Sequence, residues 1–268
     1  MSWEVLARHE AGTSVSGNSI RLLLALLIMV CVFGGYLFPV IGAEPHTTAH
    51  FGGYMTNWMV TLVPLIGLLI GYNAIVSERT SGSLLLTLSL PHSRADVVIG
   101  KLLGRSGVIS GAIVIGLLAA GSLVVYPFGE LDVMPFLGFV LLTIGLACVF
   151  TGLGIAISMT ASSKQRATVA AFAVYFLFIL VWSELQAGVV LLLQSAGVAD
   201  QDIVSAVNAL FSVEPGTAYE RLVAGFIDPS QSLDGAWYLQ EWFALVVFVG
   251  WLLVPIGLAY VRFAEVDL

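Results

Sequence analysis

The chain has 268 residues, of which 59% are hydrophobic and only 10% are charged, and its formal net charge is −7 at pH 7. A soluble domain carries about 25% charged residues, so this composition excludes a water-soluble globular protein. Stretches of about 20 apolar residues, the length that crosses a bilayer core, recur along the chain. Cys31 and Cys148 both lie within such stretches, which argues against a disulfide framework or a zinc site. We therefore expect a multi-pass protein of the plasma membrane, with the lipid bilayer and not nucleic acid as a partner.

Six uncharged or nearly uncharged stretches are long enough to span a membrane as helices. Because lipid offers the backbone no hydrogen-bond partner, the expected fold class is all-α, with six transmembrane helices in a single domain over residues 1–268. The first stretch is longer than the apolar core of a cleavable signal peptide, so we expect it to remain as the first span. The expected spans are 22–41, 58–76, 97–126, 133–159, 167–193 and 242–261.

The positive charges predict the orientation. On this arrangement nine of the ten lysines and arginines fall on one side, and only Arg221 falls on the other. Cytoplasmic loops carry an excess of lysine and arginine, so both termini are expected in the cytoplasm. The nine are Arg8, Arg21, Arg79, Arg94, Lys101, Arg105, Lys164, Arg166 and Arg262.

Small residues recur at helical spacing within the spans. Gly67 and Gly71 lie four residues apart on the second span, a spacing that allows two helices to approach closely. Gly152 and Gly154 on the fourth span are expected either to allow a close helix approach as well or to loosen that helix. We expect these glycines to serve helix packing rather than a substrate path.

About 48 residues, 194–241, separate the fifth span from the sixth. A structureless loop of that length is uncommon in a compact protein. Residues 202–211 and 218–226 each show helical apolar spacing, with a break at 214–216. We therefore expect an extracellular subdomain of short helices.

The segment 77–94 is the most charged break between apolar stretches and is too short to span. Thr80 or Ser81 is expected to cap a surface helix that Pro91 ends, and Ser93 followed by Asp96 is a capping signal for the third span. The apolar face of the surface helix includes Leu84, Leu85 and Leu88. The residues alone leave two interpretations open. The segment is either an interfacial anchor whose Arg94 and Lys101 meet lipid phosphates, or a docking surface for a cytoplasmic partner.

Residues 71–104 resemble the stretch between the second and third spans of type-2 ATP-binding-cassette (ABC) permeases. The matching residues are Glu78, Arg79, Ser81, Gly82, Pro91, Ser93, Arg94, Gly100 and Lys101. Residues 3–10 are similar to the interfacial elbow helix of that family, and the six spans match it in outline. Within the family, the Tyr-x-Ala-Ile-Val-x-Glu run at 72–78 is most similar to the permease of the copper-site maturation system of nitrous oxide reductase.

The resemblance implies an elbow helix at 1–20 and a coupling helix at 77–94 that inserts into a cytoplasmic ABC ATPase dimer. The ATPase-coupling residues would be Glu78, Arg79, Ser81, Gly82, Leu84, Leu85, Leu88, Pro91, Arg94 and Lys101. The sequence contains no G-x-x-x-x-G-K-[ST] motif. ATP and Mg are therefore expected in the partner ATPase, with no cofactor and no catalytic residue in this chain. The resemblance also implies a homodimer.

Two hypotheses concern the outer side. Residues 213–222 are similar to an outer stretch of the copper-maturation permeases, which implies that Glu214, Pro215, Tyr219 and Arg221 contact an extracellular accessory protein. Glu184 is the one acidic residue well inside an apolar stretch and is a candidate for gating, although a straight helix places it near the outer interface.

A transient copper contact is a further hypothesis for the first outer loop. Histidine and thioether ligands suit copper, and His46 with His50, and Met55 with Met59, are each four residues apart. The alternative is an ordinary polar loop.

Three functions remain distinct at this level. The first is an ABC permease subunit, whether of the copper-maturation group or of another exporter of drugs, lipids or ions. The second is a gradient-driven secondary transporter, which predicts paired charges near the middle of several spans. The third is a membrane anchor for an enzyme complex, which would tolerate loss of the leucine face at 84–88.

Overall fold

The computed structural model describes residues 3–42, 44–82, 93–126, 129–198, 200–228 and 236–265. Over these ranges the regular structure is helical, apart from one isolated bridge between Thr47 and Glu130. The helices of the first half are α1 (Trp3–Ser16), α2 (Asn18–Ile41), α3 (Thr48–Gly71), α4 (Val76–Ser81) and α6 (Arg94–Val125). Those of the second half are α7 (Val133–Thr160), α8 (Lys164–Tyr175), the π-helix η1 (Phe176–Val181), α9 (Trp182–Ser195), α10 (Gln201–Phe211), α11 (Pro215–Phe226), the 3₁₀-helix η2 (Trp237–Leu239) and α12 (Glu241–Glu265).

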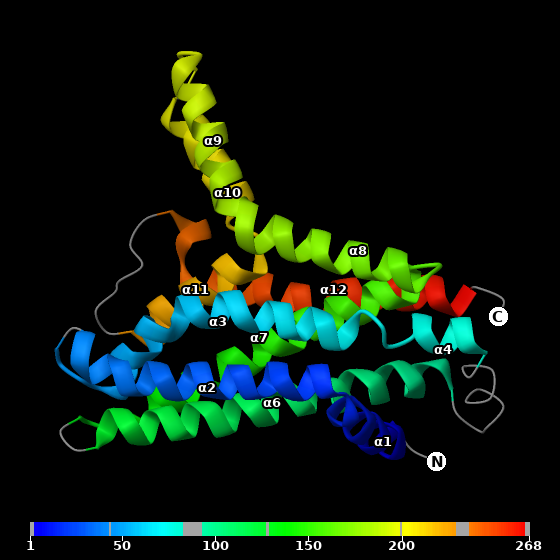
Figure 1. Cartoon of the computed structure of the whole chain (residues 1–268). Helices are drawn as coiled ribbons and strands as arrows, with labels where there is room; N and C mark the ends of the chain where they lie inside the picture. The colour runs from blue at the N-terminus through cyan, green and yellow to red at the C-terminus, as the bar shows by residue number, and fades with distance from the viewer. Residues whose placement is uncertain are drawn as a thin grey trace.

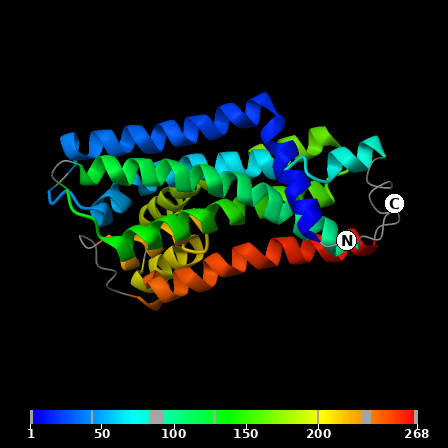
Figure 2. The same ribbon diagram turned by 90° about the horizontal axis from the view of Figure 1, so that it is seen from below.

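Six helical segments in the described ranges are long and apolar enough to cross a membrane, which confirms the all-α prediction and the number of spans. Apart from α9 in the fifth segment, they lie side by side along one long axis, with α1, α4 and the C-terminal end of α12 at one end of the bundle and α11 toward the other (Figures 1 and 2). The end of the bundle that contains α1, α4 and the C-terminal end of α12 is called the α1–α4 end.

The second span begins earlier than predicted. The sequence placed its start at residue 58, because His50, Thr56 and Asn57 interrupt the apolar pattern, whereas α3 begins at Thr48. The side chain of Thr47 caps α3 by accepting a hydrogen bond from the backbone N–H of His50. The Thr56 hydroxyl donates to the carbonyl of Gly52 within the same helix. Polar residues that bond locally are compatible with the helix, so the apolar pattern underestimated its length.

The fifth span is not the straight helix that the sequence suggested. The α-helical pattern gives way to a π-helix at Phe176–Val181, and α9 leaves the bundle at an angle to α8 (Figure 1). π-Helical turns are a known cause of sharp bends. The helices α9 and α10 form a projecting hairpin, held where Trp182 Nε1 donates to the carbonyl of Phe211 at 2.9 Å and the Gln186 amide donates to Asn208 at 3.0 Å.

The two short helices predicted between spans five and six are present as α10 and α11. The helix α11 packs against α3, α7 and α12. Its Tyr219 is fully buried, with the hydroxyl 2.8 Å from the hydroxyl of Thr143 on α7. This stretch is therefore part of the helical core as well as a connection between spans.

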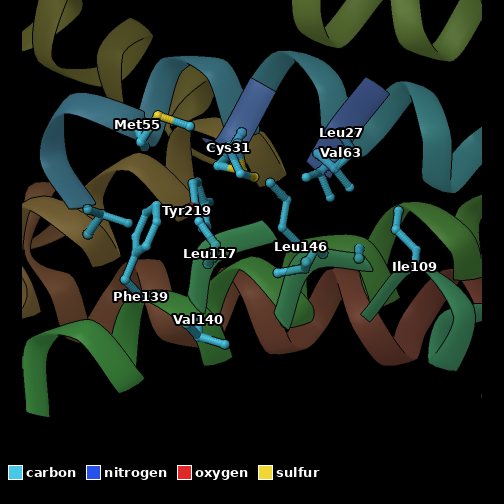
Figure 3. Close-up of a cluster of buried hydrophobic side chains, with 14 of the residues drawn as sticks. Leu27, Cys31, Met55, Val63, Ile109, Leu117, Phe139, Val140, Leu146 and Tyr219 are labelled. Atoms are coloured by element: carbon cyan, nitrogen blue, oxygen red, sulfur yellow. The ribbon is translucent and has the colours of Figure 1, made fainter. Parts of the chain in front are cut away.

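The core lies between α2, α3, α6 and α7, with α11 and α12 completing it. In Figure 3 side chains of α2 and α3, among them Leu27 and Met55, meet those of α6, α7 and α11, among them Leu117 and Tyr219. All four of these side chains have essentially no exposed surface.

The contact between α3 and α7 confirms the packing role of Gly67, Gly71 and Gly154. A Cβ added at Gly154 would lie 2.8 Å from the Cα of Gly71 and 2.9 Å from the backbone nitrogen of Tyr72. Gly67 faces Phe150 on the same helix pair. The α3–α7 contact therefore depends on the absence of side chains at these positions.

We expect Gly154→Ala to lower the free energy of unfolding by about 1–3 kcal/mol, the range for overpacking a core, because backbone atoms of α3 would have to move. Gly107→Ala on α6 is the matched control, since a Cβ there has nothing within 4 Å. Thermal unfolding of the purified protein in detergent measures both. Equal melting temperatures for the two variants would contradict the packing role.

Candidate functional site

The helix α4 sits at the end of the second span and is tied to the fourth. The chain turns at residues 72–75 after α3 ends, and the backbone N–H groups of Ile75 and Val76 both donate to the hydroxyl of Ser158 on α7, at 2.8 and 2.9 Å. Ser158 is fully buried. These bonds satisfy donors that the helix break would otherwise leave unpaired, so the break is a built feature of the fold.

A buried ion-pair network lies behind α4. The ammonium of Lys101 on α6 is 2.5 Å from a Glu10 carboxylate oxygen on α1 and 2.6 Å from Glu78 Oε1 on α4. Arg105, one turn further along α6, donates to the other oxygen of Glu10 at 3.0 Å and to the carbonyl of Ile70 at 2.5 Å. The network therefore joins α1, α4, α6 and the end of α3.

Burial makes this network a strong constraint. Lys101 is only 3% exposed and Glu10 only 7%. A buried charge without an opposite charge is strongly destabilising, so displacing α1 or α4 alone would leave Lys101 short of a partner. The positions of α1, α4 and α6 relative to one another are consequently fixed by this network.

The pKa of Glu10 reflects its surroundings. Burial by itself raises the pKa of a carboxyl, but the charges of Lys101 and Arg105 and their hydrogen bonds outweigh it and hold the pKa of Glu10 below its ordinary 4.5. A lowered carboxyl pKa stabilises the folded state above the ordinary pKa, and that stabilisation is lost as the pH falls.

Two arginines at this end cap helices distant in sequence. The Arg79 guanidinium donates to the carbonyl oxygens of Met159 and Ala161, where α7 ends. Arg94 donates to the carbonyl of Phe263 on α12 at 2.6 Å and lies over its ring, 5.5 Å from the centroid. Cations are favourable beside the carbonyl oxygens at a helix C-terminus, so both residues bind the ends of neighbouring spans.

The predicted ATPase-coupling residues are thus only partly surface groups. Ser81 and Gly82 are exposed, and Gly82 ends α4 with a φ of 77°, a conformation that favours glycine. Thr80 and Ser81 lie in the last turn of α4, with side chains bonded to the carbonyls of Ser77 and Glu78. The surface helix that one of them was predicted to cap lies outside the described residues. Leu84, Leu85, Leu88 and Pro91 lie outside the described residues.

Beyond this segment, the capping signal before the third span is confirmed, because Ser93 and Asp96 form a reciprocal capping box at the start of α6. Glu10 and Arg105 were not predicted as site residues. Their signal in the sequence is weak. Lys101 and Arg105 lie four apart, on one helix face, and so predict an acidic partner without indicating which residue supplies it.

The four residues assigned to an outer partner belong mostly to the interior. Pro215 and Tyr219 are buried, and Glu214 is 4% exposed. The Glu214 carboxylate caps α11 by accepting from the backbone N–H groups of Gly216 and Thr217, at 2.7 and 2.5 Å. Arg221 donates to the carbonyl of Tyr238 at 2.9 Å. These residues hold α11 in place, and their contact with an outer partner stays a prediction.

The residues proposed for gating and for copper contact lie in different environments. Glu184 is exposed in the first turn of α9, directly after the π-helix, at the bend. His50 bonds to Thr47 at 3.0 Å, whereas Met55 and Met59 have no exposed surface and lie in the core. In the described part of the chain no group of three or more His, Cys, Asp and Glu residues gathers into a metal site.

We expect Glu10→Gln to lower the free energy of unfolding at pH 7 by roughly 1.5–3 kcal/mol, the value of hydrogen bonds to charged groups. Lys101 and Arg105 each lose a charged acceptor, although Lys101 keeps Glu78. The difference in free energy of unfolding between the wild type and Glu10→Gln should shrink as the pH falls below 4.5 toward the lowered pKa of Glu10, because the wild-type carboxylate then becomes protonated.

Glu265→Gln, an exposed carboxylate on α12, is the control and should leave stability unchanged at each pH. Thermal unfolding in detergent across pH 3.5–7 provides the measurement, a range set around the ordinary carboxyl pKa. A pH-independent difference for Glu10→Gln would show that the carboxylate charge is not the stabilising element.

Glu214 should show the opposite pH dependence. Burial raises the pKa of this carboxyl above its ordinary 4.5, and the bonds from Thr217 and Gly216 offset this only in part. The stability it confers is full below 4.5 and declines as the pH rises through the raised pKa. Hydrogen exchange of α11 amides, corrected for intrinsic rates, should show declining protection over that window.

Glu214→Gln should flatten this profile, because an uncharged amide oxygen still accepts one backbone N–H. Glu44→Gln, an exposed carboxylate on the same side, should leave it unchanged. A wild-type profile that rises with pH would contradict the assignment.

Comparison with known proteins places this geometry in context. A family model described as ABC-2 family transporter protein matches residues 5–268. A probable ABC transporter permease protein NosY from Pseudomonas aeruginosa is 33% identical over 187 residues, 66% of each chain. A second protein of that description, from Stutzerimonas stutzeri, is 34% identical over 125 residues, 45% of each chain. The chain therefore matches just under two thirds of the first relative and less than half of the second.

Proposed function

The chain belongs to the ABC-2 family of transporter proteins, and we propose that it is the permease subunit whose spans are moved by ATP hydrolysis in a separate ATPase. The observation that carries the proposal is the network of Lys101 with Glu10 and Glu78. It gives a force applied to α4 a direct route to α1 and to the long helix α6. A coupling mechanism requires a structural element whose position is influenced by both of the sites that it connects.

The α1–α4 end is proposed to face the cytoplasm. Support comes from the nine positive residues that the sequence assigns to that side, which flank the spans there. In this orientation α4 and the residues that follow it meet the ATPase, and α11 lies toward the outer face. Ser81 and Gly82 are exposed for contact, while Glu78 and Arg79 transmit the movement inward through their bonds to α6 and α7.

The assembly is proposed to contain two copies of this chain and an ATPase dimer that binds ATP and Mg. Exposed large apolar side chains on α8, η1 and α9 support self-association, because the most apolar 18-residue part of the fifth span has no fully buried residue within one chain. An exposed apolar stretch of this extent is met either by lipid or by another helix.

The finer proposal is a role in maturing the copper sites of nitrous oxide reductase, together with an outer accessory protein. It rests on the similarity of residues 72–78 to permeases of that system and on the relatives described as NosY. The chain itself would supply mechanical coupling, and transient copper contact at His46 or His50 remains part of this proposal only.

Co-purification with the ATPase and a distance measurement test the proposal. Spin labels at the exposed Val5 on α1 and Tyr126 at the opposite end of α6, after Cys31 and Cys148 are replaced by alanine, report movement of α1. We expect the inter-label distance to change between ADP and ATP in the wild type. Glu78→Gln should retain the bound ATPase and lose most of the distance change. The substitution removes the ion pair that links α4 to Lys101 on α6.

Glu265→Gln is the control, since this exposed carboxylate on α12 makes no hydrogen bond or ion pair with any other described residue. Failure of any soluble ATPase to co-purify would reject the permease assignment. A full distance change in Glu78→Gln would instead show that α4 moves α1 by another route.

A further inference from the structure

An apolar groove runs along the α12 side of the bundle near the α1–α4 end. It lies between α7, α8 and α12 and has a volume of about 600 Å³. Its walls include Ile157 of α7, Val174 of α8 and Leu258 of α12, and Arg262 stands at its end. Both α8 and α12 pack against α7, which lies between them along the groove. A volume of this size suits a small apolar ligand.

The positive residues around this end divide into two classes. Lys101, Arg105, Arg79 and Arg94 all bind acceptors within the chain. Arg262 and Lys164 have exposed side chains that make no hydrogen bond or ion pair with any other residue in the described ranges. Arg262 lines the groove, and Lys164 begins α8 four residues after Thr160, which also lines it.

The groove therefore combines an apolar channel with a positive mouth. The N-terminus of α8, which begins at Lys164, adds the partial positive charge of the helix dipole, with one of its backbone N–H groups, that of Arg166, already bonded to the Ser163 side chain. A guanidinium binds a phosphate through paired hydrogen bonds. Basic groups between membrane helices at the cytoplasmic side are a known setting for anionic lipid headgroups.

We propose that this groove binds an anionic phospholipid, with one acyl chain between α7, α8 and α12 and the phosphate at Arg262 and Lys164. A zwitterionic lipid fits less well, because its headgroup carries a cation of its own. A second copy of the chain is the less favourable occupant, because it would have to bury the Arg262 guanidinium with no acceptor supplied by this face. The bound lipid would fill the space between the fifth and sixth spans.

Native mass spectrometry of the detergent-purified full chain tests the proposal, with phosphatidylglycerol and phosphatidylcholine of identical acyl chains as probes. We expect tighter retention of phosphatidylglycerol, and Arg262→Gln should weaken it about fivefold, as expected for the loss of one basic residue near the lipid. Retention of phosphatidylcholine should change little. Ile157→Trp should weaken both lipids by filling the groove.

Two matched controls isolate the site. Arg8→Gln removes an exposed arginine on α1, and Ile115→Trp adds bulk at a site on α6 that is 60% exposed. Both should retain lipid as the wild type does. Equal retention in Arg262→Gln and the wild type would overturn the proposal in favour of ordinary surface lipid. A shift in the monomer–dimer ratio with unchanged lipid binding would overturn it in favour of a protein interface. Melting temperatures confirm that each variant is folded.

Discussion

The ammonium group of Lys101 lies almost wholly inside the protein, at 3% exposure, and the arrangement of the α1–α4 end depends on how that charge is compensated. A buried cation is tolerated only where carboxylates and hydrogen-bond acceptors surround it. Glu10 and Glu78 supply this compensation from two helices that precede and follow the first two spans. The charge therefore specifies where α1 and α4 must sit against α6.

The helix break after α3 is the second constraint, and it is connected to the first. A break leaves backbone donors and acceptors that membrane surroundings cannot satisfy. Ser158 accepts from the N–H groups of Ile75 and Val76, while Arg105 donates to the carbonyl of Ile70. Ser158 reaches the break because α3 and α7 nearly touch at Gly71 and Gly154. Close packing in the span thus positions the polar contacts at its end.

The sequence predicted the number of spans, the two helices between spans five and six, and the capping box at Ser93, because each depends on a local pattern of apolar or capping residues. It misplaced the start of α3, since polar side chains that bond within their own helix interrupt the apolar pattern without ending the helix. The bend at Phe176–Val181 had no local signal, because that run is apolar throughout and contains neither proline nor glycine.

The site was predicted less completely than the fold for a related reason. Family resemblance indicated Glu78, Arg79 and Lys101, but Glu10 lies 91 residues from its partner Lys101, and no pattern within one sequence pairs residues over that separation. Burial of Tyr219 and Glu214 was equally invisible, because the residues that cover them come from α7 and other distant elements. Long-range partners decide whether a polar residue faces a second protein or its own interior.

Both ends of the bundle use side chains from distant segments to satisfy helix termini. At one end Arg79 and Arg94 bind the last carbonyls of α7 and α12. At the other end Trp251 Nε1 donates to the carbonyl of Val213 at 2.6 Å, next to the carboxylate of Glu214 that caps α11. Side chains from other segments can form hydrogen bonds to the backbone at the ends of a span, because the backbone groups in its interior are already bonded within the helix. The side-chain contacts that join one helix terminus to another element are therefore concentrated beside α4 at one end and between α10 and α11 at the other.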